Sequence, residues 1–224
     1  MAGCLYCIDN DIIQKLATFS LFEETLDIFS VRSTDVRILT TAKYKFRRDW
    51  ERLKAGRYRK HKATMINFEK VVTLAETLPQ IVEATIDVDL FSQLSEVDGI
   101  DQGEAALTAH VAQVLQKDDA VDAFILTGDK RYLRALATAE LPLVQENFVH
   151  RFWCLEQLVL LNIRKYGFEA VREKIVPVRD CDQACKVVFG SGELATESNA
   201  LSALNAYIET LRDETGQLLH PYPA

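Results

Sequence analysis

The chain has 224 residues, of which 48% are hydrophobic, and it carries a formal net charge of −7. This length is enough for a core of ordinary size together with a helical extension. No apolar run approaches the length that spans a bilayer, and the N-terminus lacks the basic start and long apolar stretch of a signal peptide. We therefore expect a cytoplasmic protein without a membrane segment.

The five cysteines point to the same compartment, because an odd number suits a reducing environment better than a disulfide framework. Two pairs, Cys4 with Cys7 and Cys181 with Cys185, supply enough thiolates for a zinc site. However, the first pair lies on or beside a predicted strand, where alternation directs the two side chains to opposite faces. Free cysteines that pack as small hydrophobic side chains are the favoured interpretation.

Short apolar runs alternate with helix-patterned segments through the first two thirds of the chain. This alternation predicts a three-layer α/β core around a parallel sheet over residues 1–147. Only helical periodicity follows, which predicts a helical extension over 148–224 packed on that core. In chain order we expect strands at 5–8, 36–39, 124–126 and 141–144, and helices near 12–19, 43–56, 64–84, 90–94, 104–115 and 132–137.

Residues 43–62 form a strongly basic segment, with ten Lys and Arg side chains against Asp49 and Glu51. A basic segment on an otherwise acidic chain is a candidate contact for a polyanion such as RNA, although a solvated helix face has the same composition. The interleaved aromatic residues either stack on unpaired bases or form the apolar stripe that docks the helix. The candidate RNA-binding cations are Lys43, Lys45, Arg47, Arg48, Arg52, Arg57, Arg59 and Lys60.

Three acidic residues stand at predicted element boundaries. Asp9 ends the first strand, Asp129 follows the third strand after Thr127 and Gly128, and Glu104 opens a helix. If the two strands are adjacent and parallel, Asp9 and Asp129 meet at the carboxyl edge of the sheet, where a divalent cation would compensate their charge. The competing interpretation is structural, because Asp101 and Glu104 have the spacing of a capping box.

Three motifs in this order resemble the PIN-domain family of ribonucleases, in particular the branch with a Gly-Glu-Ala element. They are YCIDNDII around Asp9, Gly103-Glu104-Ala105-Ala106 at a helix start, and LTGDKRYLRAL from Leu126 to Leu136. The resemblance covers roughly residues 4–147. It implies a Rossmann-like sheet and an enzyme of RNA processing or of the toxin–antitoxin type, with a homodimer or a protein inhibitor as possible partners.

The resemblance also implies a site with one or two Mg²⁺ or Mn²⁺ ions. Asp9, Glu104 and Asp129 would be its catalytic residues and bind metal directly or through water, while Thr127 would orient a water or a carboxylate and Lys130 would contact phosphate. One departure is that the segment 41–48, where family members commonly carry another acid, has none. The candidates to replace it are Asp49, Glu51, Asp101 and Glu146.

Two alternatives remain open. The first is a catalytically silent PIN-like module that binds nucleic acid or a protein. The second is a haloacid-dehalogenase-like phosphatase, with Asp9 and Asp11 as nucleophile and acid and with the 127–130 turn as a later motif. Against it, Ile13 stands where Thr or Val is usual, and no second Asp follows Asp129 at the expected short spacing.

Overall fold

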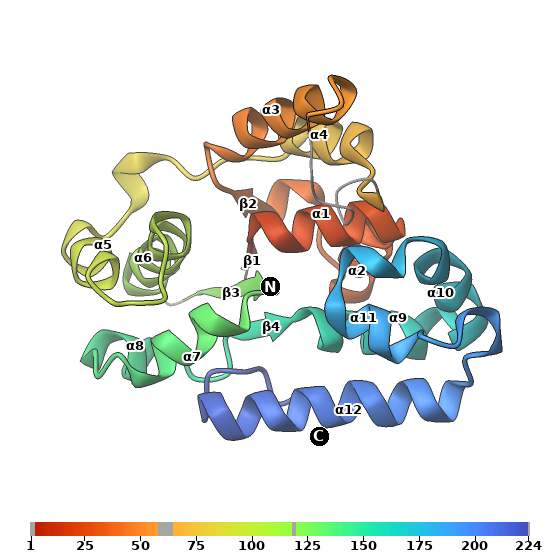
Figure 1. The fold of residues 1–224 in the computed structure, drawn as a ribbon. Helices are drawn as coiled ribbons and strands as arrows, with labels where there is room; N and C mark the ends of the chain where they lie inside the picture. The colour runs from red at the N-terminus through yellow and green to blue at the C-terminus, as the bar shows by residue number, and fades with distance from the viewer. Residues whose placement is uncertain (1–2, 58–64, 118–119, 224) are drawn as a thin grey trace.

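Four short strands form the central sheet: β1 (Gly3–Ile8), β2 (Val36–Ile38), β3 (Val121–Thr127) and β4 (Phe152–Cys154). In this computed structural model, which describes residues 3–57, 65–117 and 120–223, the strands are parallel in the order β2-β1-β3-β4 (Figure 1). Helices cover both faces of the sheet, which is why its strands are nearly continuous apolar runs. The α/β class and the parallel sheet predicted from the sequence are confirmed.

The helices form the outer layers. α6 packs on one face of the sheet against β3 and β1, with α5 beside it, while α1 and α2 lie on the other face (Figure 1). α3 and α4 pack on each other near the β2 edge. In chain order the helices are α1 (Asn10–Phe19), α2 (Phe22–Phe29), α3 (Ala42–Lys54), α4 (Phe68–Thr77), α5 (Val88–Ser95), α6 (Gln102–Lys117), α7 (Lys130–Thr138), α8 (Pro142–Asn147), α9 (Leu155–Tyr166), α10 (Phe168–Ile175), α11 (Gln183–Val188) and α12 (Glu197–Thr215). Short 3-10 turns are η1 (Ser33–Asp35), η3 (Glu83–Thr85), η4 (Val176–Cys181) and η5 (Gly192–Leu194).

The register of the two central strands fixes where the candidate acids emerge. Ile8 at the end of β1 pairs with Leu126 near the end of β3, and the Asp9 backbone N–H donates to the Leu126 carbonyl at 2.9 Å. The segments that follow β1 and β3 therefore leave the sheet side by side, at its carboxyl edge. Asp9 and the turn that ends in Asp129 are placed together by this pairing.

The last strand lies later in the chain than we predicted. The strand expected at 141–144 is wrong, because this segment opens α8 with Pro142 in the first helical turn. Proline has no N–H to donate and a φ angle already set for a helix, so it suits that position. The fourth strand is instead β4, and the sheet therefore continues past residue 147, where we placed the end of the α/β domain.

The C-terminal helices cover the remaining side of the sheet. α9 contacts α2, and α12 crosses both α7 and α9 (Figure 1). After α12 the chain runs beside β4, where the Phe152 N–H donates to Leu218 O at 3.1 Å and the His220 N–H donates to Phe152 O at 2.7 Å. None of the helices in the described part of the chain is long and apolar enough to cross a membrane.

Candidate active site

Asp9 and Asp129 each begin a helix at the carboxyl edge of the sheet. Asp9 caps α1, with its Oδ1 accepting from the Asn10 N–H at 2.6 Å. Asp129 caps α7, with its Oδ1 accepting from the N–H groups of Arg131 and Tyr132 at 2.8 and 3.1 Å. Such caps stabilise a helix by about 1 kcal/mol. In both residues the second carboxylate oxygen faces no helix N–H in the described structure.

The third acid belongs to the capping box that its spacing predicts. The Asp101 N–H donates to Glu104 Oε2 at 2.8 Å, and the Glu104 N–H donates to Asp101 Oδ1 at 2.9 Å. Asp101 is exposed, whereas Glu104 is only 6% exposed. The structural interpretation of this pair is confirmed, and one oxygen of each carboxylate remains outside the box.

The four carboxylates are close enough to act on one another electrostatically. Burial, with the neighbouring charges of Asp101, Asp129 and Asp9, raises the pKa of Glu104 to about 8. Burial, with the charges of Asp11 and Asp101, raises the pKa of Asp9 to about 6. The neighbouring carboxylates thus add to burial in making Glu104 and Asp9 harder to ionise, as expected for like charges gathered in one place.

These residues have the right chemistry for a hard divalent cation, but they do not form a preassembled cage. Within residues 3–57, 65–117 and 120–223, no three His, Cys, Asp or Glu side chains are placed to hold a metal ion together. That finding also covers the zinc hypothesis, and all five cysteines are free. Mg²⁺ commonly binds through only one or two carboxylates, with water and substrate phosphate as its other ligands. Two acids of this edge, completed by water, fit that requirement.

A hollow of about 460 Å³ opens beside the acids. It lies between the loop that precedes α6 and the first turn of α7. Thr127, which is fully buried behind it, accepts from the Asp129 N–H at 3.1 Å and has its hydroxyl 3.5 Å from Asp9 Oδ2. The Thr127 hydroxyl therefore contacts both the backbone of Asp129 and the side chain of Asp9. The hollow is lined by Ser95, Glu96, Val97, Asp98, Gly99, Ile100, Asp101, Glu104, Asp129 and Arg131.

The basic segment becomes the helix α3, which lies beside the β2 edge. Phe46 is fully buried and Trp50 is partly buried, with Lys54 Nζ 3.4 Å from the centroid of its ring, so these aromatic residues dock the helix. Tyr44 is 62% exposed and remains available for stacking. The pKa of Asp9 is raised mainly by burial, and the positive charge of Lys45 on α3 partly opposes that rise.

The other basic candidates differ in their surroundings. Arg47 pairs with Glu76 at 2.6 Å, whereas Arg48 and Arg52 approach the buried Asp49 at 3.9 and 4.0 Å. Asp49 therefore pairs within α3 and does not supply the missing acid. Lys43 and Arg57 make no ion pair within the described residues, and Arg59 and Lys60 lie outside them.

Two further candidates, Lys130 and Glu146, have surroundings that differ from those we expected. Lys130 Nζ is 2.5 Å from Glu156 Oε1 and 4.6 Å from the centroid of the Tyr207 ring, so this partly exposed lysine is engaged by two residues of the extension. Glu146 lines a hollow with Asp122, at the start of β3 and therefore at the opposite edge of the sheet from Asp129. We therefore assign Lys130 no phosphate contact and Glu146 no place among the acids of the site.

A second group of charged residues, Asp11, Lys15 and Asp182, was not predicted from the sequence, and its two aspartates line a hollow together with Asp129. Lys15 is only 12% exposed in its side chain and lies 2.5 Å from Asp11 Oδ2 and 2.7 Å from Asp182 Oδ2. The Asp11–Lys15 spacing of one helical turn was a local signal for the first contact. Nothing local could indicate Asp182, which comes from the extension.

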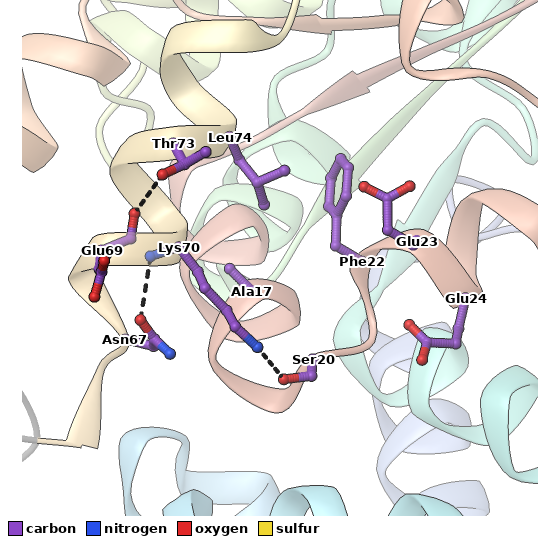
Figure 2. A pocket seen from close by; sticks show the side chains of 10 residues that line it. All are labelled: Ala17, Ser20, Phe22, Glu23, Glu24, Asn67, Glu69, Lys70, Thr73 and Leu74. Atoms are coloured by element: carbon purple, nitrogen blue, oxygen red, sulfur yellow. Dashed lines mark hydrogen bonds between the residues drawn. The ribbon is translucent and has the colours of Figure 1, made fainter.

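A hollow of about 630 Å³ lies at the other end of α1 (Figure 2). Figure 2 shows Lys70 reaching toward Ser20, whose hydroxyl accepts from Lys70 Nζ at 2.7 Å. Phe22 and Leu74 form part of its apolar wall, and the glutamates at its rim are Glu23, Glu24 and Glu69. This hollow is remote from the acids that follow β1 and β3, and we assign it no part in the site.

Comparisons with protein-family models, with curated proteins and with solved structures found no match.

Proposed function

We propose that this protein is a metal-dependent ribonuclease that hydrolyses phosphodiester bonds of single-stranded or structured RNA. The observation that carries the proposal is the register of β1 and β3, which brings Asp9 and the Asp129 turn to one edge beside Glu104. Carboxylates at the carboxyl edge of a parallel sheet are well placed to bind a ligand. The motifs that resemble PIN-domain ribonucleases are the ones that supply these three residues.

Each residue of the site has a task that follows from its surroundings. Asp9 and Asp129 would hold Mg²⁺ or Mn²⁺, and Glu104 and Asp101 would bind it through water. The ion would supply an activated water and stabilise negative charge on the phosphate. Lys45, whose charge reaches Asp9, guides the phosphate backbone from the basic face of α3 to the acids.

The test is the exchange of Asp129 for Asn. Asn keeps a side-chain oxygen that caps α7, so the fold is retained while the anionic ligand is lost. We expect Mn²⁺-dependent cleavage of single-stranded RNA to fall by more than about 100-fold, since even changes behind metal ligands cost about that much. Asp122→Asn is the matched control, because Asp122 lies on the same strand at the opposite edge. Equal cleavage by Asp129→Asn and the wild type would refute the site.

A silent RNA-binding module is the second candidate, because Asp101, Glu104 and Asp129 each have a structural role as caps. Calorimetric titration with Mn²⁺ separates the two functions. A ribonuclease site gives saturable binding that Asp129→Asn abolishes, whereas a set of caps gives none.

The phosphatase alternative has less support. Its acid would be Asp11, but this carboxylate is paired with Lys15 Nζ at 2.5 Å. Burial raises the pKa of Asp11 and the Lys15 ammonium only opposes that rise, so it is the engagement of this carboxylate in the ion pair, rather than its protonation state, that counts against the role. Release of inorganic phosphate from p-nitrophenyl phosphate, lost in Asp9→Asn, would restore this alternative.

A further inference from the structure

The C-terminal extension reaches the Asp129 turn through two ion pairs, one buried on both sides and one between the buried Glu156 and Lys130, whose side chain is 28% exposed. On one side of the turn, Lys130 Nζ is 2.5 Å from Glu156 Oε1 in the first turn of α9, and the Glu156 side chain is 4% exposed. On the other side, Lys15 Nζ is 2.7 Å from Asp182 Oδ2, with the two side chains 12% and 11% exposed. Both pairs join the α/β part of the chain to residues beyond 150.

The Lys15 pair acts on the turn through Gly128. A Cβ atom at Gly128 would clash with the Asp11 carboxylate and lie 3.1 Å from Lys15 Nζ, so the backbone of the turn packs directly on the Asp11–Lys15 pair. Asp182 is itself held in place, because its Oδ1 caps α11 by accepting from the Cys185 N–H at 2.9 Å. A continuous set of contacts therefore runs from α11 to the residue before Asp129.

Asp182 from one ion pair and both partners of the other line a second hollow beside Asp129, of about 300 Å³, which Glu104 does not line. Asp129 thus lies between two hollows, one shared with the other candidate ligands and one backed by the extension. The second hollow is lined by Asp11, Gly128, Asp129, Lys130, Leu155, Glu156, Asp182, Gln183 and Ala184.

Net stability is a poor explanation for this arrangement. Replacing a buried ion pair by packed apolar side chains is often neutral or stabilising, because the desolvation of the two charges offsets their attraction. Ion pairs on both sides of a turn do, however, fix the position of its backbone. This matters for a ligand, because ligand groups have to be held within about 0.5 Å of their working geometry. Gly128 and Lys130, the residues on which the contacts converge, are the two neighbours of Asp129 in the chain.

We propose that the extension positions Asp129 through the Lys15–Asp182 and Lys130–Glu156 ion pairs, with Lys15 and Lys130 as positioning residues. The use of Asp129 as a ligand rests on the proposed function, whereas the fixing of its turn does not. The extension then contributes to the site by holding Asp129 in position.

Amide hydrogen exchange of the full chain, measured by NMR without metal, tests the fixing of the turn. The Arg131 and Tyr132 amides report on it directly, because both donate to Asp129 Oδ1. In the double variant Asp182→Asn/Glu156→Gln, we expect these two amides to exchange at least about tenfold faster while the amides of β1 and β3 keep their protection. Asn at 182 still offers an oxygen to cap α11.

Glu214→Gln is the matched control. It breaks the exposed Arg134–Glu214 pair of 2.6 Å, which also joins α7 to the extension but does not touch the turn, and it should leave both amides unchanged. Lys130→Met, compared with Lys130→Arg, repeats the test at a partly exposed position if the double variant fails to fold. Met should loosen the turn and Arg should restore it, since Arg can still pair with Glu156.

Unchanged exchange at Arg131 and Tyr132, or an equal loss of protection throughout the sheet, would overturn the proposal. A Mn²⁺ titration then separates it from the proposed function. If the wild type binds Mn²⁺, the double variant should bind it about tenfold more weakly and Glu214→Gln equally well. If the wild type binds none, the ribonuclease proposal fails, while the exchange rates still decide whether the extension fixes the turn.

Discussion

Replacing Glu104 by Gln should make the protein less sensitive to rising pH. In the wild type, burial and the charges of Asp101, Asp129 and Asp9 raise the pKa of Glu104 from an ordinary value of 4.5 to about 8. Between these two values the folded chain holds a proton that the unfolded chain has lost, so the free energy of unfolding falls as pH rises. The slope is at most about 1.4 kcal/mol per pH unit, and over the interval between the two pKa values the whole effect is at most on the order of 5 kcal/mol.

Gln removes this penalty while keeping a side-chain oxygen for the Asp101 N–H. Urea unfolding in EDTA at pH 5, 6, 7 and 8 measures the difference, and the advantage of Glu104→Gln over the wild type should grow with pH up to about 8. Asp9, whose pKa is raised to about 6, also makes the free energy of unfolding fall as pH rises towards 6, and it does so equally in both proteins. Glu146→Gln, an exposed change at the other edge, is the control. An advantage that is the same at every pH would refute this reading of the acids.

Three further predictions follow from the same geometry. Binding of Mn²⁺ at pH 7 should release ~0.9 proton, because Glu104 must be ionised to hold the hydrated ion. Calorimetry in buffers of different ionisation enthalpy should find no such release for Glu104→Gln. Gly128→Ala should lower the free energy of unfolding by about 1–3 kcal/mol in urea unfolding, since its Cβ would clash with the Asp11 carboxylate, whereas Gly3→Ala, whose Cβ meets only Val121 at an ordinary 3.7 Å, should cost less. Lys45→Gln should reduce the slope of log RNA affinity against log salt by about one, while Lys117→Gln, on α6 outside the basic helix, should leave it unchanged.

The sequence was sufficient for those parts of the site that depend on local pattern and parallel pairing. An apolar run that ends at Asp9, and another that ends at the Asp129 turn, predicted two buried strands with acids at one edge. The structure pairs Ile8 with Leu126 and confirms that placement. The Asp101–Glu104 capping box was likewise readable, because capping depends on a spacing of three residues.

What the sequence could not indicate depends on contacts between distant residues or on ambiguous short runs. The run 141–144 is as apolar as a strand, and only Pro142 in its first turn indicates a helix. β4 is three residues long and is defined by its pairing with β3. Asp182 meets Lys15 across most of the chain, and no local pattern connects them.

The structural and the functional interpretations of Glu104 lead to different expectations about which residue should stand there. A capping box needs only one side-chain oxygen at this position, and Gln supplies it without adding a charge. The chain instead carries an acid that is 6% exposed and faces the charges of three neighbouring carboxylates, at a cost on the order of a few kcal/mol once it is ionised. A bound divalent cation would turn this repulsion into attraction. The burial of an acid among like charges at Glu104 is therefore left unexplained by a purely structural role, and the proposed metal site would account for it.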